Sequence, residues 1–258
     1  MKIAVVTGAS SGMGREFALK IDKSGLDELW VIARRKERLE SLQAEIDIPV
    51  RAISLDLTDT LSYSEYATLL KEASPDVKML VNCSGYGKFG TYEDVPLEDC
   101  NGMIDLNCKA LVNITQLTLP YMSEGASILN LDSLSAFQPV PYLNVYAATK
   151  AFVLSYSRGL CMELKPRGIH CMAICPGWVK TEFFDRAETT NNGRVNYFNH
   201  TYTATQVVDR ALKDLKKKKQ VSVCGLPIRN QVRLVKLLPH SLVMKIWCSQ
   251  QQNKKKSR

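Results

Sequence analysis

The sequence of 258 residues predicts an α/β domain in which a parallel sheet of about seven strands carries helices on both faces. Short apolar runs alternate along the chain with longer segments whose apolar residues recur at helical spacing. The short runs are mostly apolar, as strands covered on both faces are. Hydrophobic residues make up 45% of the chain, and a chain of this length can bury one large core.

Each expected element follows from that alternation, taken in chain order. The expected strands are Lys2–Val6, Glu28–Ala33, Val50–Leu55, Met79–Asn82, Ser127–Leu131, His170–Ile174 and Gln220–Val223. The expected helices are Gly12–Ser24, Lys36–Ile46, Leu61–Ala73, Leu97–Met122, Tyr142–Lys165 and Thr205–Lys217. Ligands of such sheets bind beyond the carboxyl ends of the strands, so we expect functional residues there.

The junction of the first strand and the first helix carries a glycine-rich turn, TGASSGMG, at residues 7–14. Gly8 allows the sharp turn, Gly12 lets the backbone approach phosphates, and Gly14 permits close packing of helix and strand. The turn directs backbone N–H groups and a helix N-terminus at a pyrophosphate. It therefore predicts a Rossmann-type, doubly wound sheet with a dinucleotide site.

Tyr146 and Lys150 lie four residues apart in a predicted helix, so they share one face, and Ser133 lies thirteen positions upstream. The phenol of a free tyrosine has a pKa of about 10, too high for proton exchange at neutral pH. A neighbouring cation favours the phenolate and lowers that pKa. A decrease of roughly three units requires about 4 kcal/mol. The pattern therefore indicates a tyrosine that exchanges a proton with a substrate.

Together, these residues resemble the short-chain dehydrogenase/reductase family in its single-domain branch. The glycine motif of that family matches residues 7–14, and its Asn-x-x-Gly motif matches residues 82–85. Its Pro-Gly motif matches residues 176–177, and matches run in the expected order from residue 3 to about residue 225. Residues 82–85 read Asn-Cys-Ser-Gly, whereas the family usually has Asn-Asn-Ala-Gly. The flanking Asn82 and Gly85 remain, so the turn should survive.

The resemblance implies four catalytic residues. Tyr146 would exchange a proton with the substrate oxygen, and Ser133 would donate a hydrogen bond to that oxygen. Lys150 would lower the pKa of the tyrosine and hold the hydroxyls of the nicotinamide ribose. Asn107 would hold a helix backbone open for a water that relays protons to Lys150. Ser135 is a rival to Ser133, but its spacing to Tyr146 matches the family less well.

The end of the second strand favours NADP as the cofactor. Arg34 and Arg35 stand where an NAD site usually has an acidic residue, and a guanidinium binds phosphate bidentately. Ser10 or Ser11 could add a hydroxyl contact, and the alternative is that both arginines are solvated residues at a helix start. The resemblance implies that the remaining cofactor contacts are Gly8, Gly12, Met13, Gly14, Asp56, Leu57, Asn82, Ser84, Gly85, Tyr146, Lys150, Pro176, Gly177, Val179 and Thr181.

The resemblance places the substrate loop at roughly residues 183–202. Phe183 and Phe184, with Phe137 and Tyr142, could form an apolar pocket around Ser133 that suits a small apolar carbonyl or alcohol, such as a steroid or lipid. The alternative is that these aromatic residues only pack the loop onto the core.

We therefore expect an NADP-dependent enzyme acting on CH–OH groups, of the hydroxysteroid dehydrogenase type and involved in lipid metabolism. A 3-oxoacyl or long-chain ketone reductase is the closest alternative. The non-enzymatic alternative is an NADP-sensing or membrane-surface interaction protein.

The basic charge is concentrated at the C-terminus. The chain carries a net charge of +8, and residues 213–258 hold thirteen Lys or Arg residues against one acid. Residues 1–225 are expected to form the NADP-binding catalytic part. Residues 226–258 would form a basic amphipathic extension of the same domain, serving as a lid, an oligomer arm or a weak contact with a membrane surface.

Other features narrow the range of partners and locations. The eight cysteines lack metal-ligand spacing, so we expect no metal and a reducing cytoplasm. The first strand begins at once, so we expect no signal peptide, and no apolar run is long enough to span a bilayer. The basic residues form no motif that reads nucleic acid. Relatives often pair through their two long helices, so we expect a homo-oligomer, either a dimer or a tetramer.

Overall fold

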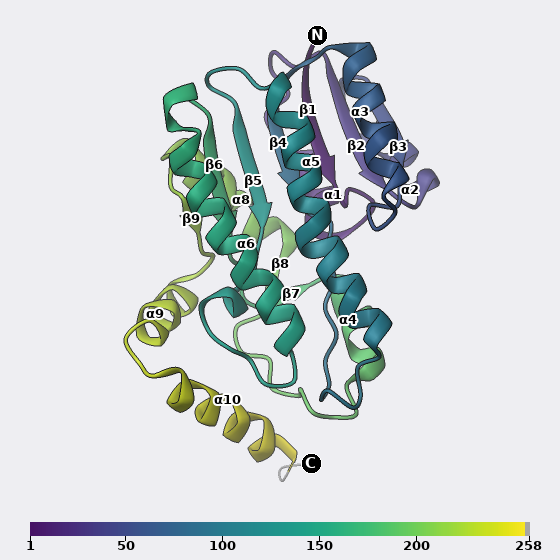
Figure 1. Cartoon of the computed structure of the whole chain (residues 1–258). Helices are drawn as coiled ribbons and strands as arrows, with labels where there is room; N and C mark the ends of the chain where they lie inside the picture. Colours follow the sequence, from purple (N-terminus) through teal and green to yellow (C-terminus); the bar gives the residue numbers. More distant parts are fainter. Residues whose placement is uncertain (256–258) are drawn as a thin grey trace.

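Within residues 1–255, which the computed structural model describes, seven parallel strands form the central sheet, in the order β3-β2-β1-β4-β5-β6-β9 (Figure 1). The strands are β1 (Lys2–Thr7), β2 (Glu28–Ala33), β3 (Val50–Ser54), β4 (Asp76–Asn82), β5 (Ser127–Leu131), β6 (His170–Ile174) and β9 (Val221–Ser222). The order along the chain reverses between β1 and β4. A crevice for ligands therefore lies beyond the carboxyl ends of these strands.

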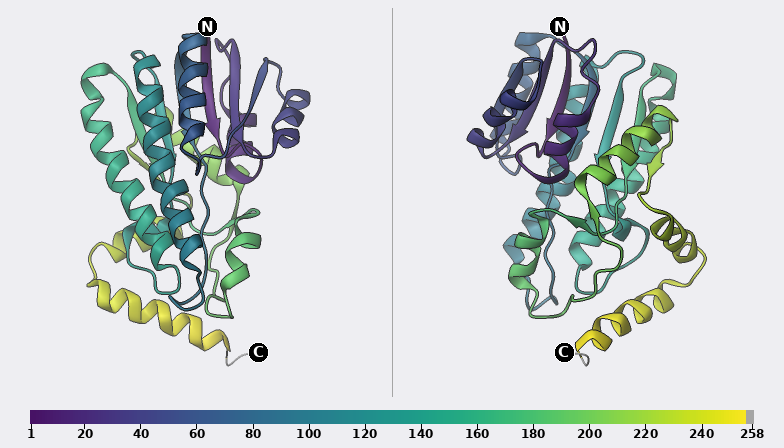
Figure 2. Two further views of the ribbon diagram at one scale, coloured as in Figure 1. Left: turned by 45° about the vertical axis from the view of Figure 1, so that its right-hand side comes forward. Right: turned by 180° about the vertical axis from the view of Figure 1, so that it is seen from behind.

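Helices cover both faces of this sheet (Figure 2). Apolar side chains of α3 (Leu61–Ala73), α5 (Ala110–Thr118) and α6 (Asn144–Glu163) pack on one face, in a cluster that includes Trp30 and Tyr66. Side chains of α1 (Gly12–Lys20), α2 (Lys36–Glu40) and α8 (Ala204–Lys216) pack on the other face. The predicted fold class, a Rossmann-type sheet between two helical layers, is confirmed.

One long helix predicted at residues 97–122 is interrupted in the structure. It consists of α4 (Leu97–Ile104), a π-helical turn (Asp105–Lys109), α5, and a 3-10 turn (Leu119–Tyr121). Asn107 lies in the π-helical turn, where its Oδ1 accepts a hydrogen bond from the Tyr86 N–H at 3.0 Å. Its Nδ2 donates to the Tyr86 carbonyl at 2.9 Å. The extra residue of the turn thus aims this side chain at the segment after β4.

The sequence did not predict the elements between β6 and α8. Two short parallel strands, β7 (Val179–Lys180) and β8 (Tyr202–Thr203), pair apart from the main sheet. Between them lies α7 (Phe183–Ala187), a helix of a little more than one turn. Elements this short show no apolar period that sequence reasoning can detect. They form a small structure beyond the carboxyl ends of the strands, over the crevice.

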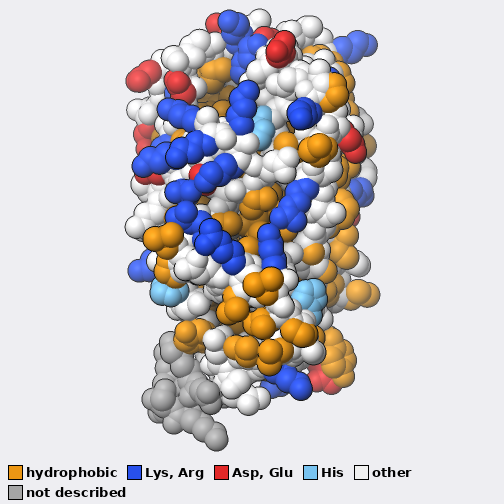
Figure 3. Space-filling view, turned by 90° about the vertical axis from the view of Figure 1, so that its left-hand side faces the viewer, with side chains coloured by type: hydrophobic (Ala, Val, Ile, Leu, Met, Phe, Trp, Pro, Cys, Tyr) orange, Lys and Arg blue, Asp and Glu red, His pale blue; other side chains and the backbone are white. Residues whose placement is uncertain are grey.

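The C-terminal extension folds as two helices, α9 (Leu226–Val235) and α10 (His240–Lys255). They are separated at Pro239, which cannot continue a helix. Figure 1 shows α10 across the end of the molecule opposite the N-terminus. Figure 3 shows hydrophobic side chains gathered beside Lys and Arg side chains on the side where α9 lies. The last part of the predicted basic extension, residues 256–258, lies outside the described residues.

Candidate active site

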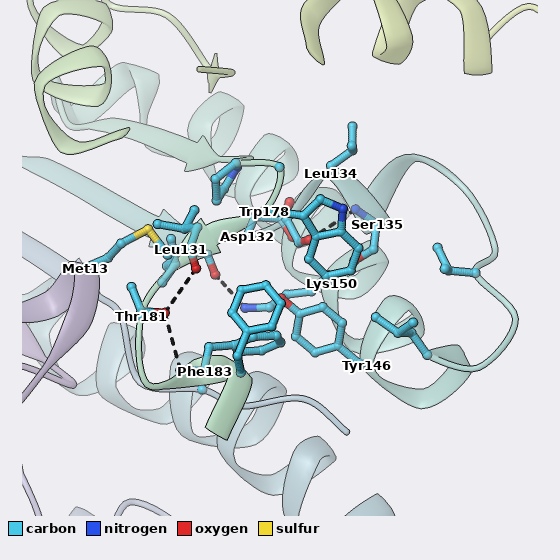
Figure 4. A pocket seen from close by; sticks show the side chains of 18 of the residues that line it. Met13, Leu131, Asp132, Leu134, Ser135, Tyr146, Lys150, Trp178, Thr181 and Phe183 are labelled. Atoms are coloured by element: carbon cyan, nitrogen blue, oxygen red, sulfur yellow. Dashed lines mark hydrogen bonds between the residues drawn. The ribbon is translucent and has the colours of Figure 1, made fainter. Parts of the chain in front are cut away.

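Two adjoining hollows open beyond the carboxyl ends of the strands. The first is a long cleft of about 960 Å³ that runs past the glycine turn and the ends of β2 and β3. The second is a mostly apolar cavity between the end of β5, the start of α6 and the elements after β6 (Figure 4). Both hollows are lined by Met13, Gly85, Thr181 and Phe183, so they meet along one wall.

Most of the predicted contacts line these two hollows. Predicted residues on the cleft are Gly8, Ser10, Ser11, Gly12, Met13, Gly14, Arg34, Arg35, Asp56, Leu57, Ser84, Gly85 and Thr181. Predicted residues on the cavity are Ser133, Tyr146, Lys150, Pro176, Gly177, Val179, Phe183 and Phe184. Asn82 and Asn107 line neither hollow and lie buried behind them.

The glycine turn has a backbone that larger residues would disrupt. Gly8 has a φ of +68°, and a methyl group there would lie 2.8 Å from the backbone of Cys83. A methyl group on Gly14 would overlap the carbonyl of Gly8. The Thr7 hydroxyl fastens the turn to the neighbouring segment by accepting hydrogen bonds from the N–H groups of Cys83 and Ser84, at 3.1 and 3.2 Å. The turn and the N-terminus of α1 therefore fit a pyrophosphate.

Arg35 lies at the rim of the cleft beside two hydroxyl groups. Its Nη2 donates hydrogen bonds to Ser10 Oγ at 3.1 Å and to Ser11 Oγ at 3.0 Å. Arg34 is more exposed, and its Nη1 lies 3.7 Å from Asp56 Oδ2. One guanidinium and two hydroxyls form a set of donors suited to a phosphate group. The predicted arginine and serines thus lie together.

Tyr146 and Lys150 project from the first turns of α6 into the cavity, and both are buried. Lys150 Nζ lies 5.7 Å from the centre of the Tyr146 ring and donates a hydrogen bond to the Leu131 carbonyl at 2.8 Å. Ser133 follows β5, and its Oγ accepts a hydrogen bond from the Ser135 N–H at 3.2 Å. Figure 4 shows the tyrosine and the lysine side by side. The three residues at the family's catalytic positions therefore share one wall.

The electrostatics of this wall differ from the prediction. Burial raises the pKa of Tyr146, a hydrogen bond with the Ser133 side chain opposes the rise, and Asp132 adds to it. Burial also lowers the pKa of Lys150, while Asp132 opposes that change. The predicted lowering of the tyrosine's pKa is therefore wrong, because the effect of burial prevails. The cavity is mostly apolar, and Lys150 is hydrogen-bonded to the Leu131 carbonyl.

The substrate side of the cavity contains two of the four predicted aromatic residues. Phe183 and Phe184 line it, and the Phe183 ring centre lies 5.4 Å from that of Tyr146. Phe137 and Tyr142 do not line it. The Phe137 ring instead lies under the cations of Arg158 and Lys236, and Tyr142 occupies a turn with a φ of +67°.

Sequence reasoning missed several residues that line the two hollows. Trp247 of α10 stacks on Trp178 with ring centres 6.4 Å apart and donates a hydrogen bond to the Pro141 carbonyl at 2.9 Å. Both tryptophans line the cavity, so the C-terminal extension forms one of its walls.

Asp132 lies between β5 and Ser133 and is 2% exposed. An acid directly after a buried strand was the one signal in the sequence that could have identified it.

Comparison with known proteins agrees with this geometry. A family model described as short chain dehydrogenase matches residues 2–192. Sulfoacetaldehyde reductase 2 of Chromohalobacter salexigens is 38% identical over 187 residues, which are 70% of this chain and 74% of that protein. Serine 3-dehydrogenase of Rhizobium radiobacter is 36% identical over 182 residues, 69% of this chain and 72% of that protein. A short-chain dehydrogenase from Sphingobium yanoikuyae, solved in complex with NADPH, superposes with a TM-score of 0.76 at 29% identity over 86% of this chain and 87% of that chain.

Proposed function

Because the chain belongs to the short-chain dehydrogenase/reductase family of oxidoreductases, we propose that it uses NADP to interconvert a secondary alcohol and a ketone. One observation carries this proposal. Tyr146, Lys150 and Ser133 share the wall of a cavity that opens into the cleft holding Arg35. A substrate oxygen beside the tyrosine would then lie next to a coenzyme bound along the glycine turn. The NADPH bound by the Sphingobium relative supports the choice of coenzyme.

The side chains of the cavity suggest how the reaction proceeds. The bound coenzyme supplies or accepts the hydride. Tyr146 donates its phenolic proton to the carbonyl oxygen in reduction and accepts the hydroxyl proton in oxidation. Ser133 donates a hydrogen bond to the same oxygen and stabilises the charge that develops there. Burial keeps the phenol protonated, which is the form that reduction requires.

Lys150 and Asn107 have supporting roles in this proposal. Lys150 would hold the nicotinamide ribose hydroxyls and pass protons toward Tyr146. Asn107 keeps the π-helical turn open, because its side chain hydrogen-bonds to Tyr86 and, at 3.0 Å, to Thr149 Oγ1. That opening would accommodate a water molecule on the proton path.

The lining of the cavity favours an apolar substrate of the steroid or lipid type. Phe183, Phe184 and Trp178 form apolar walls, and Lys150 is the one cation on the cavity within the described part of the chain. That lysine is assigned here to the nicotinamide ribose, so no further cation on the cavity would pair with a carboxylate or a sulfonate. Uncharged ketones are therefore favoured over charged small substrates. A 3-oxoacyl or long-chain ketone reductase remains the alternative.

A panel of carbonyls and alcohols followed by NADPH absorbance tests the reaction and the substrate class. It should span steroid ketones, acyl thioesters, simple ketones, serine and sulfoacetaldehyde. Tyr146→Phe should bind NADPH but lose nearly all turnover, whereas Tyr156→Phe, on the same helix but away from the cavity, should retain it. Equal turnover of Tyr146→Phe and the wild type would disprove the role given to the phenol.

The exposed face of the C-terminal helices supports a second role, which is weak peripheral contact with an anionic membrane from the cytoplasmic side. Leu234, Leu237 and Ile246 are 55%, 82% and 45% exposed, and Lys236 and Lys245 lie among them. Apolar side chains flanked by cations suit such a surface. No helix among residues 1–255 is long and apolar enough to cross a bilayer.

Flotation with anionic liposomes at low and high salt tests this contact. Absence of binding at low salt would end the membrane proposal. Size-exclusion chromatography tests the predicted homo-oligomer, in which a second copy could cover the same face.

A further inference from the structure

Glu182 forms a clasp across the rim of the coenzyme cleft. Its Oε2 lies 2.9 Å from Arg35 Nη1, and its Oε1 lies 2.5 Å from Arg38 Nη1. The two arginines come from the start of α2, whereas Glu182 directly precedes α7, nearly 150 residues further along the chain. Hydrogen bonds from Arg38 and Arg35 lower the pKa of Glu182, so the carboxylate is charged at neutral pH. An anion of the protein thus occupies the rim.

The clasp lies where the phosphate donors of the cleft converge. Arg35 uses Nη1 for Glu182 and Nη2 for the hydroxyls of Ser10 and Ser11. All four residues line the same cleft. A guanidinium fork binds carboxylate and phosphate with the same geometry, so the two anions are alternatives at this site. They also repel each other when they are close.

We propose that Glu182 competes with the 2′-phosphate of the coenzyme for Arg35 and so sets the preference between phosphorylated and unphosphorylated coenzymes. This inference rests on the proposed use of NADP. A coenzyme that carries the phosphate must displace the carboxylate from Nη1. A coenzyme without the phosphate leaves the clasp intact. Glu182 is thus a specificity-determining residue that moderates the affinity for NADPH.

The clasp is also connected to the substrate cavity, because the residues that follow Glu182 in the chain, Phe183 and Phe184, line that cavity. Arg38 keeps its ion pair with Oε1 when the phosphate takes Arg35, so the segment that leads into α7 stays attached to α2.

Isothermal titration of four ligands tests the competition: NADPH, NADH, adenosine 2′,5′-bisphosphate and adenosine 5′-phosphate. Glu182→Gln should lower the Kd of the two 2′-phosphorylated ligands about threefold to fivefold, the range expected for releasing an exposed ion pair. The Kd of the other two ligands should stay within about twofold, because they do not need that donor. Glu182 is 45% exposed, so its replacement should not unfold the protein.

Glu40→Gln is the matched control. Glu40 lies on α2 and pairs with Lys36 at 3.7 Å, so the change removes the same charge without touching the clasp. It should leave all four affinities unchanged. Glu182→Ala should act in the same direction as Glu182→Gln, and an Arg35→Ala background should abolish the gain.

The outcomes separate this inference from the proposed function. A wild type that binds NADH as tightly as NADPH, with a Glu182→Gln variant that gains no affinity for the 2′-phosphorylated ligands, would refute both the NADP proposal and the competition. A wild type that prefers NADPH, with a Glu182→Gln variant whose affinities are unchanged or change equally for all four ligands, would refute the competition alone.

Discussion

Replacement of Asp132 by Asn should change the stability of the protein in a pH-dependent way. The difference in unfolding free energy between the variant and the wild type should move in favour of the variant as the pH rises. Asp132 is 2% exposed, and its Oδ1 has no hydrogen-bond partner within the described part of the chain. Its Oδ2 accepts a weak hydrogen bond from Cys175 Sγ at 3.4 Å. Burial raises the pKa of this carboxyl to about 7, while Lys150 opposes the rise. The folded protein therefore holds a proton that the unfolded chain releases.

The sign and size of the effect follow from linkage. Between the unfolded pKa of 3.8 and the folded pKa of about 7, the folded state binds one more proton, so the free energy of unfolding falls as the pH rises. Each pKa unit corresponds to about 1.4 kcal/mol. Between pH 5 and pH 8 most of the loss accumulates over the two pH units below the folded pKa of about 7. The wild type therefore loses about 3 kcal/mol of stability over this range because of this group. An asparagine at this position does not ionise, so the variant does not lose this stability as the pH rises.

Urea unfolding followed by circular dichroism at pH 5 and pH 8 measures this difference. The stability of Asp132→Asn minus that of the wild type should increase by about 3 kcal/mol between the two pH values. Asp47→Asn, at an exposed position, controls for removal of a carboxylate and should show no such increase. A difference for Asp132→Asn that does not vary with pH would refute the inference that burial raises the pKa of this carboxyl.

Three other predictions concern the two hollows. Gly14→Ala should weaken NADPH binding at least about tenfold in a fluorescence titration, because the methyl group overlaps the Gly8 carbonyl and displaces the turn. Trp247→Ala should lower the free energy of unfolding by about 2 kcal/mol in urea and raise KM for apolar ketones, since it removes a ring contact, the bond to the Pro141 carbonyl and a cavity wall. Because burial raises the pKa of Tyr146, ketone reduction should stay level from about pH 6 to about pH 8 while alcohol oxidation accelerates, as initial rates in both directions will show.

The sheet was predictable because its strands are buried on both faces. The bounds of β2, β5 and β6 match the expected strands, as mostly apolar runs buried on both faces allow. The π-helical turn was not predictable. Apolar residues keep their helical period through residues 97–122, and Tyr86, to which Asn107 of the turn hydrogen-bonds, lies twenty-one residues earlier in the chain.

The site was predictable only where its residues follow strands or share a helix face. Phe137 stands close to Ser133 in the sequence, but the 3-10 turn between them directs its ring toward Arg158 and Lys236. Glu182 joins segments almost 150 residues apart, and no local pattern shows such a contact.

The Tyr146–Lys150 spacing predicted where two side chains lie, but not their charges. Burial raises the pKa of Tyr146 and of Asp132 and lowers that of Lys150, so all three groups shift toward their neutral forms. One cause explains the three shifts, because burial penalises any charge whatever its sign. A cation lowers the pKa of a phenol only when the attraction between the charges exceeds the cost of desolvating both. Here the ammonium lies 5.7 Å from the ring, so desolvation prevails, and the spacing of the residues could not reveal it.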